Sequence, residues 1–177
     1  MQFSLENIEE YLLQELSLEA IKSLDKNLEI DKYIIKQLWQ LILTDRQPVS
    51  WRAAWALYHL TCKRKEFMVP YIQQIIELLP QFKFDGQKRE LLKVLMLFDL
   101  KDLDTGRILN VCYDFLSNPN ESLAVRVHSM QMIFNISELE PELKSELKST
   151  ILFHYQESSA GFQSRANKLL KKMKDID

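Results

Sequence analysis

Glycine and proline are scarce in this sequence of 177 residues, and their scarcity excludes several classes of protein. There are three glycines and five prolines, too few for the many turns of a sheet protein of this length. A phosphate-binding loop needs two or three glycines within a few residues, whereas Gly86, Gly106 and Gly161 are isolated from one another. The composition therefore favours long helices and excludes the common nucleotide-binding loops.

Cysteine and histidine are too few to build a metal site or a disulfide framework. Cys62 and Cys112 each lie within an apolar helical pattern, where a thiol behaves as a small hydrophobic group. His59 and Cys62 could share one helix face, but a structural zinc site needs about four ligands and a catalytic one about three. No serine or cysteine has a recognisable activating base. We expect no metal, no cofactor and no catalytic activity.

Long apolar runs are also missing. The longest aliphatic and aromatic stretch in the second half of the chain covers residues 94–98, far below the roughly 18 residues of a membrane span. Residues 1–6 lack the basic start of a signal peptide. We therefore expect a soluble, cytoplasmic protein that does not associate with a membrane.

What the sequence does contain is apolar residues at helical spacing along nearly its whole length. Representative sets are Tyr33, Ile34, Leu38, Leu41 and Ile42, then Tyr71, Ile72, Ile75, Ile76 and Leu79. Such spacing marks one buried stripe per helix. Polar caps and prolines divide the pattern into about ten helices, with Ser50 and Asp104 among the expected N-caps. The short connections between them predict antiparallel neighbours.

An arginine recurs once per pair of predicted helices. The four positions are Arg52, Arg89, Arg126 and Arg165, at intervals of 37, 37 and 39 residues. Each begins a second helix, after a short loop that carries Asp45, Asp85, Asn118 or Glu157. This pattern resembles the HEAT repeat family, most closely at residues 45–57 and 125–133. Glu90 and Leu91 depart from it, because small residues are usual there.

The resemblance implies an all-α fold, a right-handed α-α superhelix of about four HEAT-like hairpins behind an N-terminal helical cap. Armadillo-like stacking is the close alternative. Stacked hairpins share one continuous core because a single hairpin cannot bury both of its faces. The expected single solenoid domain of residues 1–177 comprises a cap over 1–29 and repeats over 30–66, 67–103, 104–140 and 141–177.

The repeated arginines allow two interpretations. The resemblance implies a structural ladder, in which guanidinium groups bond acidic side chains and carbonyls between adjacent repeats. Alternatively, some of them face the concave groove and bind an anionic partner. The predicted second helices carry many more basic than acidic residues, which favours a basic groove, although lysines near helix C-termini also simply complement the helix dipole.

Three aromatic residues, Trp51, Trp55 and Tyr58, recur at i, i+4 and i+7 in the predicted helix that contains Arg52. This spacing places them on one side of the helix. An opposing apolar stripe comprises Ala53, Ala56, Leu57 and Leu60. A helix that is apolar on two sides is either enclosed between layers or exposes aromatic anchors for a partner.

These features predict a non-catalytic scaffold or adaptor that binds a protein or peptide on the concave face, an acidic one if the groove is basic. The candidate contact residues are Trp51, Arg52, Trp55, Lys88, Arg89, Arg126 and Arg165. The alternative is a nucleic-acid-binding protein related to the HEAT-like alkylation-repair DNA glycosylases, against which the pI of about 6.0 argues. A subunit that works only within an oligomer is a third hypothesis.

Charge is unevenly distributed along the chain. Residues 1–31 contain eight acidic and two basic side chains, whereas residues 32–177 contain seventeen acidic and twenty-one basic ones. An acidic start on a mildly basic body indicates either an acidic cap or two surfaces that suit partners of opposite sign.

Overall fold

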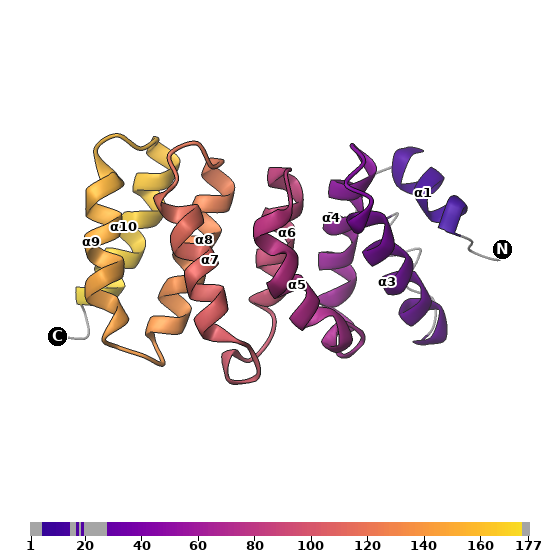
Figure 1. Ribbon diagram of the computed structural model, residues 1–177, viewed down its shortest axis with the longest axis horizontal. Coiled ribbons are helices and arrows are strands. Elements are labelled where there is room, and N and C mark those ends of the chain that lie inside the picture. The colour runs from indigo at the N-terminus through magenta and orange to yellow at the C-terminus, as the bar shows by residue number, and fades with distance from the viewer. Residues whose placement is uncertain (1–4, 15–16, 18, 20–27, 175–177) are drawn as a thin grey trace. The chain divides into compact units, whose positions relative to one another are not determined.

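A computed structural model describes residues 5–14, 17, 19 and 28–174, and all regular structure in this part of the chain is helical, as predicted (Figure 1). The chain divides into two compact units, residues 1–99 and 100–177. Much of the predicted N-terminal cap lies outside the described residues, and the boundaries proposed for the four repeats stay a prediction.

The first unit is built around α4. Its α-helices are α1 (Leu5–Gln14), α3 (Leu28–Leu43), α4 (Val49–Thr61), α5 (Ile72–Leu78) and α6 (Asp85–Leu95), and short 3-10 turns lie at Lys65–Phe67, Val69–Tyr71 and Leu79–Gln81. Helix α4 packs against α1, α3 and α6 (Figure 1). Its inward residues include Ala53, Ala56, Leu57 and Leu60, all fully or almost fully buried. Small alanine side chains let the neighbouring helices approach closely and fill the interior at the density of a close-packed core.

The second unit is built around α8. It comprises a 3-10 turn at Leu100–Asp102 and the helices α7 (Thr105–Ser117), α8 (Leu123–Ser137), α9 (Leu143–Tyr155) and α10 (Ala160–Lys174). Helices α7, α9 and α10 all pack on α8 (Figure 1). As a result α8 is buried over more than half of its circumference, including Val125, Met130, Ile133 and Phe134, while a stripe from Ala124 to Asn135 stays half-buried.

Local signals place some helix starts correctly and miss others. The Asp104 side chain accepts a hydrogen bond from the Arg107 backbone N–H at 3.0 Å, which confirms the predicted cap of α7. The predicted cap at Ser50 is wrong, because α4 already begins at Val49, after Pro48. Ser50 is instead buried inside the first turn, where its hydroxyl accepts a hydrogen bond from the Gln47 side chain at 2.6 Å.

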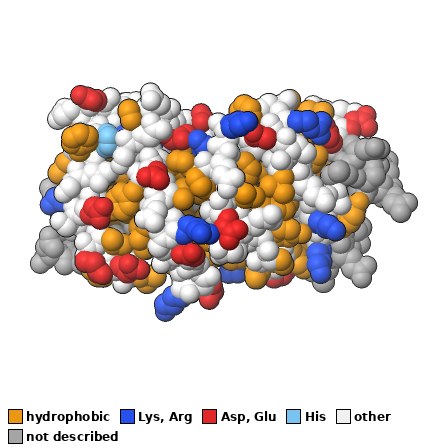
Figure 2. Space-filling model, in the orientation of Figure 1, with side chains coloured by type: hydrophobic (Ala, Val, Ile, Leu, Met, Phe, Trp, Pro, Cys, Tyr) orange, Lys and Arg blue, Asp and Glu red, His pale blue; other side chains and the backbone are white. Residues whose placement is uncertain are grey.

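Polar and apolar side chains are mixed on the outer surfaces. In each unit, the face shown in Figure 2 has apolar side chains among both acidic and basic ones. This face therefore carries no uniform charge of one sign, and a binding surface has to be sought in specific clusters of side chains.

Candidate binding site

The most distinctive surface of the first unit runs along α4 and α6. Half-buried side chains line it, and the buried core lies beneath. We call this surface the α4–α6 face; it comprises Trp51, Trp55, Tyr58 and His59 of α4 with Gly86, Arg89 and Lys93 of α6. The three aromatic residues predicted from spacing thus lie together on one side of α4, neither sealed in the core nor fully exposed.

Two contacts set the register of α6 along α4. A Cβ atom added at Gly86 would lie 2.8 Å from the Cβ of Trp51, and the Lys93 ammonium lies 3.7 Å from the centre of the Tyr58 ring. Both pairs are 35 residues apart in sequence, so the two helices run parallel in a constant register over two turns. Gly86 allows this approach because a side chain there would collide with the tryptophan.

Beneath the face lies a carboxylate that sequence reasoning treated as one of the solvated charges. The Glu90 side chain is 2% exposed and bonds the Arg89 Nε at 2.9 Å and the Lys93 Nζ at 2.6 Å. Two cations around one buried acid leave a net positive charge, and hydrogen bonds from both make its burial tolerable. The signal that could have found this cluster was the departure of Glu90 from the small residues usual at its position.

His59 lies between the aromatic and the charged groups. Its ring is 4.4 Å from that of Trp55 and 5.0 Å from that of Tyr58, both in edge-on geometry. Burial, and then the nearby Lys93 charge, lower the pKa of His59, while Glu90 opposes the shift. The imidazole is therefore neutral at neutral pH and serves as an aromatic contact with a hydrogen-bonding edge.

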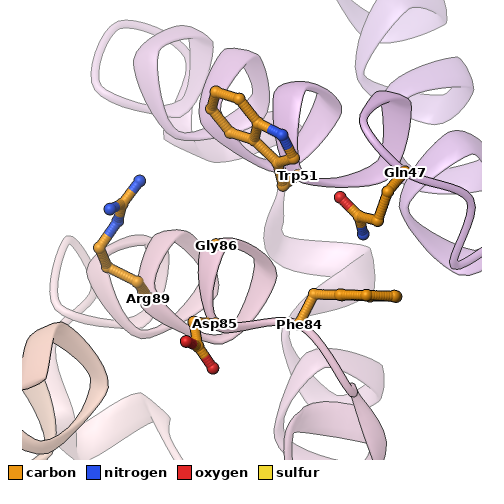
Figure 3. Close-up of a pocket in the computed structure, with 6 residues that line it drawn as sticks. All are labelled: Gln47, Trp51, Phe84, Asp85, Gly86 and Arg89. Carbon is orange, nitrogen blue, oxygen red and sulfur yellow. The ribbon is translucent and has the colours of Figure 1, made fainter. Parts of the chain in front are cut away.

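A shallow pocket of about 390 Å³ lies where the two helices begin. Its lining comprises Gln47, Trp51, Phe84, Asp85, Gly86 and Arg89. In Figure 3 the Trp51 ring lies above the backbone at Gly86, Arg89 extends on the same side one turn further along α6, and Asp85 points away from both. The pocket thus offers an aromatic wall beside a guanidinium group, and Lys88 does not line it.

Two of the four repeated arginines secure helix ends. Arg52 donates hydrogen bonds from Nη1 to the carbonyl oxygens of Leu12 and Leu13, at 2.8 and 2.9 Å, near the C-terminus of α1. Arg126 donates from Nε to the Leu116 carbonyl at 3.0 Å, near the C-terminus of α7. These carbonyls lack partners within their own helices, so each arginine acts as a C-terminal cap.

The other two repeated arginines make different contacts. Arg165 donates to the Gln131 side-chain oxygen at 3.0 Å and so joins α10 to α8, whereas Arg89 pairs with Glu90 in its own helix. A ladder of four equivalent arginines is therefore not what the structure contains. Arg126, one of the predicted contact residues, is buried: it is 8% exposed, and its guanidinium group lies 4.8 Å from the centre of the Phe162 ring.

The repeat architecture agrees with a comparison of whole sequences. A family model described as a HEAT repeat domain matches residues 8–173. The chain belongs to the HEAT-repeat family. No curated protein and no solved structure matches this HEAT-repeat chain at a significant level. The family assignment confirms the resemblance drawn from the recurring arginines, and HEAT repeats are typical of protein-interaction scaffolds.

Other kinds of site find no support in the described part of this HEAT-repeat chain. No group of three or more histidine, cysteine, aspartate or glutamate side chains is arranged there to hold a metal ion. None of its helices has both the length and the apolar character that crossing a membrane requires.

Proposed function

We propose that this HEAT-repeat chain is a non-catalytic scaffold that binds an acidic protein segment on its α4–α6 face. The observation that carries the proposal is a row of half-buried aromatic residues, Trp51, Trp55 and Tyr58, flanked along the neighbouring helix by Arg89 and Lys93. Half-buried aromatic rings with fixed positions are the residues most often found at the energetic centre of protein interfaces.

Contacts with α6 hold two members of the aromatic row in place. Trp51 rests on Gly86, and Tyr58 is held beneath the Lys93 ammonium. Rigid anchors lose little conformational entropy on binding, which raises the affinity available from a given contact area. An extended or helical segment lying along α4 would cover the three rings one after another.

The charges on the face favour an acidic segment. Glu90 is buried and already paired with two cations, so the trio of Arg89, Glu90 and Lys93 has a net positive charge. Arg89 uses only its Nε for this pair, and its terminal guanidinium nitrogens remain suited to a carboxylate of the partner. Asp85 also lines the pocket, but in Figure 3 its carboxylate points away from Trp51 and Arg89.

A displayed library of random peptides tests the proposal because it samples many candidate partner sequences at once. We expect selection on the intact chain to enrich peptides that combine acidic with apolar residues. Trp55→Ala should then weaken their binding by about thirtyfold, the loss of a typical interface anchor, and Arg89→Ala by about threefold to tenfold. Isothermal titration calorimetry measures both, with circular dichroism to verify folding.

The matched controls lie in the other unit. Phe153→Ala removes a ring that is 82% exposed on α9, and Arg107→Ala removes an exposed charge on α7; neither should alter the affinity of the selected peptides. Equal binding by the Trp55→Ala variant and the unaltered chain would exclude the α4–α6 face. Tight, salt-dependent binding of labelled duplex DNA in place of peptides would favour the nucleic-acid alternative.

A further inference from the structure

A second surface, separate from the α4–α6 face, lies between α9 and α10 in the second unit. It is a groove of about 420 Å³, and its lining comprises Lys148, Leu152, Asn167, Leu170 and Lys171. Leu152 is 51% exposed, and the neighbouring Phe153 is 82% exposed. Large apolar side chains exposed to this extent beside a groove are typical of an interaction surface.

The groove is distinct from the stripe that these helices bury. Helix α9 buries Leu147 and Ile151 and helix α10 buries Ala166 and Leu169, while both helices pack on α8. The groove residues are offset by one position from this stripe, so they form a second face of the same hairpin. In a stack of repeats such a face is normally covered by the next helical element or is polar.

The rim of the groove is basic. Lys148 of α9 and Lys171 of α10 line it directly. Helix α10 contains no acidic residue. Helix α9 has the exposed Glu146 two residues before Lys148, but Glu146 does not line the groove. An apolar floor between lysines fits an acidic helix that presents a leucine.

Such a helix exists in the chain itself. Residues 1–31 contain eight acidic side chains and two basic ones. Within them, α1 buries Ile8 and Leu12 against its own unit and is held there by the ion pair of Glu9 with Arg46 at 2.7 Å. What α1 leaves exposed is a short stripe at helical spacing, formed by Glu10, Leu13 and Gln14.

We propose that the α9–α10 groove of one copy binds the exposed stripe of α1 in a second copy. Leu13 enters the groove beside Leu152 and Leu170, and Glu10 lies between the rim lysines. The two surfaces differ, so the contact is head-to-tail and leaves a free groove at one end and a free α1 at the other. Copies therefore assemble into short linear chains rather than into closed symmetric dimers.

Sedimentation velocity on the full chain over a series of concentrations tests this proposal. We expect the average mass to rise with concentration and to fall with added salt, which screens the charges at the rim. Glu10→Lys, and separately the double variant Lys148→Glu with Lys171→Glu, should each weaken self-association by at least about tenfold. A matched reversal elsewhere, Lys65→Glu in an exposed turn of the first unit, should leave it unchanged.

Mixing the variants distinguishes this geometry from any symmetric contact. The Glu10→Lys copy keeps its groove, and the double variant keeps its α1, so an equimolar mixture should assemble where neither variant does alone. The reversed α1 and the reversed groove are also complementary, so the mixture should extend beyond two copies, which a closed symmetric dimer would not. Combining all three substitutions in one chain reverses both charges and should restore assembly. Leu152→Ser, which changes no charge, should also prevent it.

Three outcomes would overturn the proposal: a single-chain mass at the highest concentration, a mixture that stays monomeric, or self-association that is unaffected by the rim substitutions. None of these bears on the α4–α6 face, because that face shares no residue with either surface.

Discussion

The second helices of the two units occupy equivalent places in their hairpins but are used differently. In the first unit, α4 and α6 leave Trp51, Trp55 and Tyr58 half exposed above a buried, charge-paired Glu90. In the second unit, the corresponding half-buried stripe of α8 carries Ala124, Val127, Gln131 and Asn135 and no tryptophan or tyrosine, and Phe162 of α10 is fully buried. The difference shows that a repeat fixes where a helix lies and which of its faces stays half-buried, but not the side chains that this face offers to a partner.

The largest expected difference between the units is in the reactivity of their cysteine thiols. Cys62 at the end of α4 is exposed, whereas Cys112 on α7 is buried. Burial raises the pKa of the Cys112 thiol to about 12, and the nearby Ser129 hydroxyl opposes this shift only in part. Because the thiolate is the reactive form, alkylation at pH 8 should modify Cys62 at least about a hundredfold faster.

Mass spectrometry of the native protein over time measures this contrast, and a sample in denaturant gives the reference in which both thiols react. Comparable native rates would mean that the core of the second unit opens readily, and the contrast between the units would then be lost.

The repeated arginines should differ next in their effect on stability. Arg126→Ala removes the donor to the Leu116 carbonyl and leaves a cavity against Phe162, so the free energy of unfolding should fall by about 2–4 kcal/mol. Arg89→Ala leaves Glu90 its bond to Lys93 and should cost at most about 1 kcal/mol.

Urea unfolding followed by circular dichroism compares the two arginine variants. Arg126→Met, which keeps the packing but not the charge, separates the cavity from the lost hydrogen bond. Equal losses for the two alanine variants would show that burial does not distinguish the arginines.

A smaller difference in stability is expected between alanine substitutions at two glycines, each of which is the second residue of its helix. At Gly86 an added Cβ would lie 2.8 Å from the Cβ of Trp51, which is fixed to the backbone. At Gly161 the nearest atom is the end of the Leu123 side chain at 2.9 Å, which is itself exposed and free to turn. Gly86→Ala should cost about 1–3 kcal/mol, and Gly161→Ala should lie within about 0.5 kcal/mol of neutral because alanine favours a helix.

Thermal unfolding of the two glycine variants, with Gly106→Ala as the case of an open position, tests this difference. The comparison fails if Gly161→Ala proves as costly as Gly86→Ala.

The smallest expected effect is that of pH on the first unit. The pKa of His59 is lowered from its ordinary value of 6.5 in the folded chain, first by burial and then by Lys93. The unfolded chain therefore binds a proton first as the pH falls, and stability should decrease from about pH 6.5 downward until the folded histidine is also protonated. His59→Gln should remove this contribution, so a difference between the variants at pH 7.5 and 5.5 measures it.

The pKa of His154 in the second unit is lowered in the same direction, by burial and then by the Arg126 charge. His154→Gln therefore provides the matched variant. An unchanged pH dependence in both variants would assign the loss of stability below pH 6.5 to the carboxylates instead.

Much of the fold could be predicted because its signals are local. The cap of Asp104 on α7 acts within one turn, and the apolar spacing of each helix repeats every three or four residues. The recurring arginine indicated the family, and the match over residues 8–173 confirms it. The prediction of Ser50 as an N-cap was wrong because serine can also lie inside the first turn of a helix. There its hydroxyl accepts a hydrogen bond from the Gln47 side chain instead of capping the backbone.

The site was only partly predictable because its defining contacts join distant residues. The aromatic row on α4 follows from spacing alone, but Trp51 meets Gly86 and Tyr58 meets Lys93 across 35 residues of sequence. The two cationic partners of Glu90 are near it in sequence. The burial of this ion cluster, however, depends on the packing of α4 against α6.

The sequence by itself determined that the chain forms helices, approximately where each one lies, and that an arginine recurs with each pair. Only the tertiary structure decided that Arg52 and Arg126 cap helix ends while Arg89 lies beside the open aromatic row. Helix formation depends on interactions within a few residues, whereas the burial of a side chain depends on which other helix packs against it.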